Sequence, residues 1–200
     1  MKRILVSCLA LVFVLSFVAC KKDSDTGAPT ANIAGDWKFV SIEAQVLNTT
    51  QYYEDGVNYK TTTSTDYTTI NNTGTMKIDP STMTCSNMAY AISTISHGQS
   101  FENNVLVDTL SFPFEYEVPS YNSTVTYKTI GSDSMYFSSG DYLFQTGNTI
   151  QGNPNGVKYK LDGNKLKFFS NYSETQSEIQ FGTEVLSTNK AILTMNFEKN

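Results

Sequence analysis

Beyond Ile33 the chain consists of short segments in which apolar and polar residues alternate, separated by Gly, Asn, Asp and Ser. Residues 112–118 show the pattern most clearly, with one face made by Phe112, Phe114, Tyr116 and Val118. Pro113 cannot donate a hydrogen bond to a neighbouring strand, which assigns this segment to a sheet edge or a bulge. Because no segment of about 11 residues or more keeps a helical period, the pattern predicts an all-β domain.

Hairpin turns are predicted where glycine follows Asp or Ser between two such segments, since glycine accepts a positive φ at little cost. Three dipeptides have this chemistry: Asp55-Gly56, Ser139-Gly140 and Asp162-Gly163. A last turn is expected near Thr188-Asn189, before a final strand in which Leu193, Met195 and Phe197 point inward. Roughly ten to twelve strands joined in this way form an antiparallel meander, which closes as a barrel or folds as a β-sandwich.

The first 19 residues have a different pattern. Lys2 and Arg3 precede an apolar run that ends on the small residue Ala19. The charged start, the short apolar stretch and the small residue at its end are typical of a secretory signal peptide, and the stretch is too short to favour a membrane span.

A cysteine follows this run directly. The stretch Phe17-Val18-Ala19-Cys20 resembles the lipobox of bacterial lipoproteins, in which the cysteine thiol receives a diacylglyceryl group and becomes the new N-terminus. The resemblance implies lipidation of Cys20 with acyl chains such as palmitate, and therefore a membrane partner through the N-terminal lipid. Two or three chains hold a domain on a bilayer durably. Since Asp does not directly follow Cys20, the resemblance also implies the outer membrane of a Gram-negative cell envelope.

The chain therefore divides into a signal peptide (1–19), a lipidated cysteine with a flexible tether (20–32) and a β domain (33–200). The tether is polar, contains Gly27 and Pro29, and has no apolar period. An extended chain spans at most ~3.5 Å per residue, so the tether can lift the domain roughly 40 Å from the lipid surface.

Charge and cysteine content restrict the domain further. Lys2 and the only arginine, Arg3, are two of the 14 basic residues, and both lie in the predicted signal peptide. Without this peptide the chain has 12 lysines and 19 acidic residues, a net charge of −7. This balance provides no basic groove for nucleic acid. With Cys8 in the signal peptide and Cys20 acylated, Cys85 is the only thiol left, so no intrachain disulfide is expected. We interpret Cys85 as a small buried apolar residue.

The opening of the β region carries a second resemblance. Gly35-Asp36-Trp37 looks like the G-x-W of the lipocalin first strand, and GDWKFVSIE resembles the start of bacterial lipocalin-like lipoprotein domains. The final STNKAILTMNFEKN is similar to their closing strand. The resemblance implies a lipocalin-like β-barrel in which Gly35 and Trp37 are structural. Lipocalins place a late-strand arginine over the tryptophan, and here only Lys190 or Lys199 could stand in for it.

Candidate catalytic and metal-binding groups are few. His97 is the only histidine, and its neighbour Gly98 indicates an exposed loop, so neither a hydrolase triad nor a histidine metal site is expected. Glu115 and Glu117 share one strand face and indicate a solvated surface. Asp133 and Asp141 flank a predicted hairpin without the spacing of a calcium loop. We therefore expect no enzyme activity, no cofactor and no metal.

Tyrosine is the remaining candidate for binding, because it offers a ring face with a hydroxyl at its tip. The expected aromatic surface comprises Tyr52, Tyr53, Tyr59, Tyr67 and Tyr116, although tyrosine is also common in ordinary strands. Three functions fit: a carrier whose barrel binds a small apolar or amphipathic ligand, a β-sandwich that binds a glycan or a protein, and a structural lipoprotein without a ligand. An internal cavity would favour the carrier, and a filled core would favour the others. The sequence leaves the oligomeric state open.

Overall fold

The computed structural model describes residues 32–137 and 156–200. These residues form strands and tight turns without a helix, as the alternating pattern predicts, so they hold no helix long and apolar enough to cross a membrane. The nine strands are β1 (Gly35–Glu54), β2 (Val57–Thr68), β3 (Ile70–Ile78), β4 (Thr82–Glu102), β5 (Val105–Ile130), β6 (Ser134–Phe137), β7 (Gly156–Asp162), β8 (Lys165–Gln180) and β9 (Thr183–Lys199).

All nine strands belong to one antiparallel sheet that returns on itself. Consecutive strands from β3 to β9 pair in chain order, and β9 pairs with β1 along nearly its whole length. Strands β2 and β3 lie one after the other between β1 and β4, β2 against Glu43–Glu54 and β3 against Gly35–Lys38. The strands therefore form a ring, consistent with the expected closed meander.

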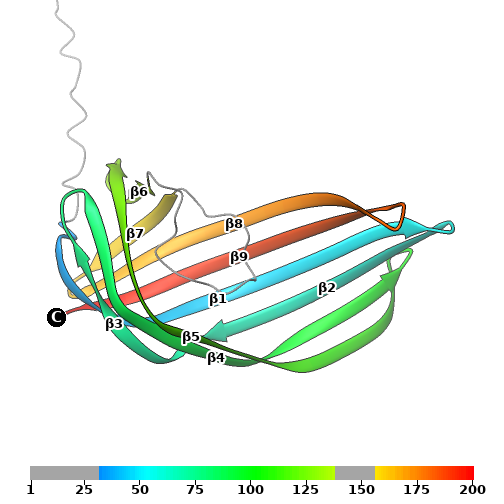
Figure 1. Ribbon diagram of the computed structural model, residues 1–200, viewed down its shortest axis with the longest axis horizontal. Helices are drawn as coiled ribbons and strands as arrows, with labels where there is room; N and C mark the ends of the chain where they lie inside the picture. Colours follow the sequence, from blue (N-terminus) through cyan, green and yellow to red (C-terminus); the bar gives the residue numbers. More distant parts are fainter. Residues whose placement is uncertain (1–31, 138–155) are drawn as a thin grey trace, which may run out of the picture.

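Three long hairpins project from this ring (Figure 1). They consist of residues 47–64, 97–111 and 173–190, and we call them together the extension. The short strands β6 and β7 complete the ring only beside Tyr127–Ile130 of β5 and Lys165–Phe169 of β8. Among the described residues, the earlier part of β5 and the later part of β8 therefore pair on one side only.

The inside of the ring is filled with side chains, as expected for a ring of few strands. Trp37, Phe39, Phe168 and Phe197 are each at most 2% exposed, and Phe39 packs against Phe197 with ring centroids 5.7 Å apart. The five methionines after Met1 are also buried, and their flexible side chains fill irregular gaps: Met76, Met83, Met88, Met135 and Met195. Leu193, Met195 and Phe197 point inward as predicted.

Two of the predicted turns are confirmed. Asp55-Gly56 connects β1 to β2 with positive φ at both residues, and the chain reverses between Asp162 and Lys165 with a positive φ at Gly163. Ser139-Gly140 lies outside the described residues. Pro113 lies in the part of β5 that has a neighbour on one side only among the described residues, which agrees with its assignment to an edge.

Two local predictions are wrong. Thr188-Asn189 is not a turn, because β9 runs without interruption from Thr183 and the turn is made by Phe181-Gly182. His97 is not in a loop, since it lies within β4, where its Nδ1 is 2.9 Å from Ser111 Oγ. Within residues 32–137 and 156–200 the strands number nine and are longer than expected, because polar residues inside long strands resemble breaks when read from the sequence.

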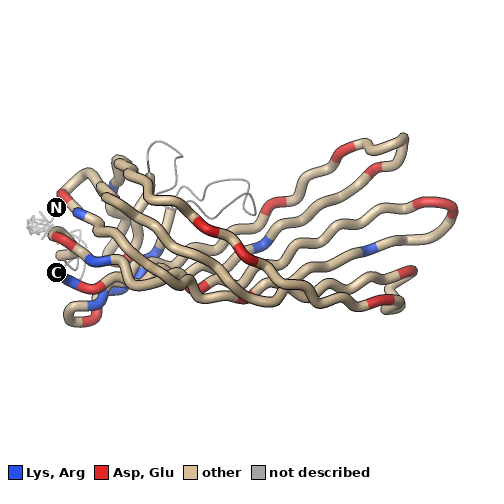
Figure 2. The backbone as a smooth tube through the Cα atoms, turned by 60° about the horizontal axis from the view of Figure 1, so that its bottom comes forward, with Lys and Arg blue, Asp and Glu red and all other residues tan. Residues whose placement is uncertain are grey.

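Charged residues are unevenly distributed along the molecule (Figure 2). The extension carries seven acidic residues and only two lysines, Lys60 and Lys190. The other eight described lysines lie in the ring, mainly at the end near the C-terminus: Lys38, Lys77, Lys128, Lys158, Lys160, Lys165, Lys167 and Lys199.

Candidate functional site

The G-x-W stretch lies at the end of the ring away from the extension. Gly35 has a φ of +132°, which L side chains rarely adopt, so the chain enters β1 at a position that favours glycine. Trp37 is 1% exposed, and its Nε1 donates a hydrogen bond of 2.9 Å to the carbonyl oxygen of Ile33. Trp37 therefore has a structural position.

A lysine from the last strand lies near this tryptophan. Lys199 Nζ is 5.9 Å from the centroid of the Trp37 ring, within the range of a cation–π contact. Lys190 is not close, because it pairs with Leu47 in the extension. Of these two lysines, Lys199 is therefore the one beside the Trp37 ring.

A hollow of about 190 Å³ lies on the inner face of the sheet, where the filled ring gives way to the extension. It is lined by Val46, Asn48, Thr63, Thr65, Tyr67, Ser96, Phe112 and Phe114, and we call it the inner hollow. Val46, Thr65, Ser96 and Phe112 occupy directly opposed positions on β1, β2, β4 and β5. The walls are mainly apolar with a few polar groups, which is the usual composition of a small-molecule site.

The polar groups of the inner hollow differ in how they are satisfied. The hydroxyls of Thr65 and Ser96 are buried and bond to each other at 2.7 Å. Asn48 Oδ1 is also buried, but accepts no hydrogen bond from any described residue. An unsatisfied buried acceptor costs about 1–3 kcal/mol. A ligand with a hydroxyl or amide donor would remove this cost.

Tyr67 lines the inner hollow at the ring side. Burial raises its pKa from 10.0 to about 12, so the hydroxyl stays protonated across the physiological pH range. A protonated phenol donates as well as accepts, so the hollow contains groups of both kinds.

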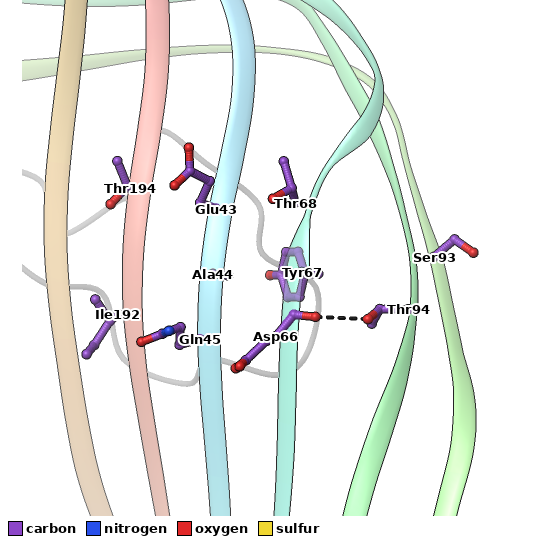
Figure 3. Close-up of a pocket in the computed structure, with 10 residues that line it drawn as sticks. All are labelled: Glu43, Ala44, Gln45, Asp66, Tyr67, Thr68, Ser93, Thr94, Ile192 and Thr194. Atoms are coloured by element: carbon purple, nitrogen blue, oxygen red, sulfur yellow. Dashed lines mark hydrogen bonds between the residues drawn. The ribbon is translucent and has the colours of Figure 1, made fainter.

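A larger hollow of about 580 Å³ lies on the outer face (Figure 3). It forms where β2 and β4 separate between the pairs Thr65–Ser96 and Ile70–Ala91, and there Thr94 Oγ1 donates to the carbonyl oxygen of Asp66 at 2.9 Å. Its lining is mostly polar and includes Glu43, Gln45, Thr68 and Thr194. Among the described residues, no three potential metal-ligating side chains come together here or elsewhere. We regard it as a shallow, hydrated depression.

The predicted tyrosine surface is divided. Tyr52 and Tyr59 stack with ring centroids 5.0 Å apart and an interplanar angle of 20° near the tip of the extension. Tyr67 and Tyr116 share the same sheet face nearer the ring, whereas Tyr53 points to the opposite face and is 64% exposed. The tyrosines therefore do not form one continuous platform.

The remaining chemical candidates are not brought together. Glu115 and Glu117 are exposed on β5. Asp133 Oδ1 accepts a hydrogen bond from its neighbour Ser134, and Asp141 lies outside the described residues. Cys85 is fully buried, and burial raises its pKa to about 12, which makes it a poor nucleophile.

Asn48 is the residue of the inner hollow that sequence reasoning missed. It falls in an Asn-X-Thr triplet, which by itself indicates nothing about burial. The available signal was its place in the alternation, since Asn48 follows Ala44 and Val46 at the same two-residue interval and both are buried.

Comparison of the chain with protein-family models, with curated proteins and with solved structures finds no match.

Proposed function

We propose that this protein is a lipid-anchored protein of the cell envelope that binds a small amphipathic ligand in the inner hollow. Asn48 Oδ1 carries the proposal, because it is a buried acceptor without a partner in a mainly apolar hollow. The ligand has a short apolar part for Val46, Phe112 and Phe114, and a hydrogen-bond donor for Asn48. The volume of about 190 Å³ limits the buried part to a small molecule or the end of a longer one.

A donor-matched ligand pair tests this function. 1-Octanol has a hydroxyl donor, whereas methyl heptyl ether has nearly the same size and shape without one. Calorimetry should show that octanol binds about tenfold more tightly, because only the alcohol satisfies Asn48 Oδ1. Asn48→Leu should remove this difference. Asn189→Ala is the matched control, since Asn189 is directly opposite Asn48 on β9 but does not line the hollow. Absence of saturable binding by either compound would refute the carrier function.

The lipid anchor is proposed on the resemblance of Phe17-Val18-Ala19-Cys20 to a lipobox, and these residues lie outside the described part of the chain. In its host, the protein should incorporate radiolabelled palmitate. Cys20→Ser should abolish the label, and Cys85→Ala should keep it because Cys85 is a buried core residue. Label retained in the Cys20 variant would disprove acylation at this position.

The lipocalin-like class belongs to the same proposal. It is supported by the sequence resemblance, by the buried Trp37 after Gly35 and by Lys199 beside the Trp37 ring. These features agree with a G-x-W end of a small barrel.

A second candidate is binding of a glycan or protein at the tips of the extension. Phe181 at the β8–β9 turn is completely exposed, and a hollow of about 320 Å³ beside it includes Tyr52, Glu54 and Val185. Exposed aromatics at a tip favour contact with a partner. A glycan array screened with wild type and Phe181→Ser would test it, and identical array profiles would reject this role of Phe181.

A further inference from the structure

The β7–β8 hairpin presents lysines on its outer face. Alternation along the two strands buries Val157, Tyr159, Leu166 and Phe168 in the ring. The intervening positions are exposed, and four of them are lysines that we call together the lysine surface: Lys158, Lys160, Lys165 and Lys167.

This arrangement is unfavourable for the sheet itself. Lys160 is directly opposite Lys167, and like charges in opposed positions repel each other. Lys165 lies between Asp162 on β7 and Glu198 on β9, yet it makes no ion pair with either. The one ion pair found in the described residues joins Lys77 to Asp79 and includes none of these four lysines. The lysine surface therefore keeps positive charge available for an external anion.

Exposed apolar side chains border the lysines. Phe169 is directly opposite Lys158 and is 38% exposed, while Tyr136 on β6 and Ile130 on β5 are 42% and 57% exposed. These three side chains and Lys158 line one hollow of about 370 Å³ on the outer face. Cations beside aromatic and aliphatic groups match the interface of an anionic bilayer, with phosphates outside and acyl chains beneath.

The β7–β8 hairpin lies at the end of the ring opposite the extension, where it can meet a bilayer surface (Figure 1). Its turn lies beside the ends of the described chain, because Asn164 accepts a hydrogen bond from Lys199 N and Asn164 Nδ2 donates to Glu198. Trp37, near the start of the described residues, pairs with Lys199 at this end. The acidic extension points away from it (Figure 2).

We infer that the lysine surface, together with Ile130, Tyr136 and Phe169, binds the surface of an anionic lipid bilayer. In this orientation the end of the ring that holds Trp37 and Lys199 faces the membrane, and the acidic extension projects away from it. The inference uses a different face from the inner hollow and does not depend on a ligand there.

The test uses the chain from Lys21 onward, which lacks Cys20 and therefore any acyl group at that position. All nine described strands and every described buried side chain lie after residue 32, so this chain keeps the described core. Co-sedimentation with vesicles of phosphatidylcholine, with and without phosphatidylglycerol, should show binding only to the anionic vesicles. Added salt should weaken it.

A double variant and its charge-matched control locate the surface. Each lysine near an anionic bilayer increases partitioning about fivefold, so Lys160→Gln with Lys167→Gln should lower the partition coefficient about thirtyfold. Lys60→Gln with Lys190→Gln removes the same charge from the extension and should change it little. Circular dichroism checks that both double variants keep their β structure.

Three results would overturn the inference: no preference for the anionic vesicles, an equal loss in both double variants, or tighter binding to a soluble polyanion such as heparin than to the vesicles. The first would remove the lipid partner, the second would reduce the effect to net charge, and the third would replace the bilayer by a soluble acidic polymer.

Discussion

Strand β1 passes through both the ring and the extension, and its inward side chains change at the boundary. In the ring these side chains are apolar, and Trp37, Phe39 and Ile42 are each 1% exposed. In the extension they become Asn48, Thr50 and Tyr52, which are partly or fully exposed. The reason is geometric, since the ring encloses its interior on all sides, whereas the extension is a single layer of sheet with water on both faces.

This comparison explains where the candidate site lies. Binding requires apolar walls and an accessible opening, and the boundary between the two regions supplies both. Val46 is the last buried apolar residue along β1, and Asn48 is the first polar one on the same face. The inner hollow contains both residues.

The largest expected difference between the regions concerns aromatic truncation. Trp37→Ala should lower the free energy of unfolding by about 3–5 kcal/mol, because it empties a large volume inside the filled ring. Tyr52→Ala removes a stacked but partly exposed ring and should cost about 1 kcal/mol. Urea denaturation followed by circular dichroism measures both. The blue-shifted emission expected of wild-type Trp37 is an independent check, and equal costs for the two variants would contradict the contrast.

A smaller difference is expected for glycine substitution. Gly74 in β3 has a φ of +108°, and an added Cβ would lie 2.7 Å from Met88 Cα. Gly74→Ala should therefore destabilise the ring by about 2–4 kcal/mol. At Gly182, at a tip of the extension, an added Cβ meets no atom within 4 Å, and only the φ of +86° disfavours a side chain. Gly182→Ala should therefore lower the free energy of unfolding by about 1 kcal/mol. A shift of the denaturation midpoint as small for Gly74→Ala as for Gly182→Ala would show that β3 and β4 adjust easily.

Another effect appears only in alkaline solution. Burial raises the pKa of Cys85 from 9.0 to about 12. Above pH 9 the unfolded chain loses this proton while the folded chain keeps it, so the stability contributed below pH 9 is lost as the pH rises toward 12. Tyr67, with its pKa raised from 10.0 to about 12, adds a loss that begins near pH 10.

Cys85→Ala separates these two contributions. The variant should lack the part of the decline that begins near pH 9 and keep the part that begins near pH 10. Urea midpoints measured from pH 8 to pH 11 test this, and superimposable profiles for the variant and wild type would show that Cys85 is not the buried group responsible.

The sequence by itself determined the class of the fold and most of the ring. A two-residue period needs only local information, because successive side chains of a strand point to opposite faces. For this reason the inward positions of Leu193, Met195 and Phe197 were predictable. The hairpins at Asp55-Gly56 and Asp162-Gly163 were predictable from turn chemistry, which is also local. The errors at Thr188-Asn189 and His97 both fall in the extension, where hydrated faces allow polar residues in the middle of a strand.

Only the tertiary structure decided which distant residues share a surface. The inner hollow combines residues from β1, β2, β4 and β5, and its unsatisfied acceptor depends on what those four strands place around Asn48. The lysine surface is equally invisible in the formal net charge of −5, because that sum does not reveal that alternation and the β7–β8 register place Lys160 opposite Lys167. Alternation is a property of each strand, whereas register and ring closure arise from contacts between segments far apart in the chain, and these contacts determine where side chains meet.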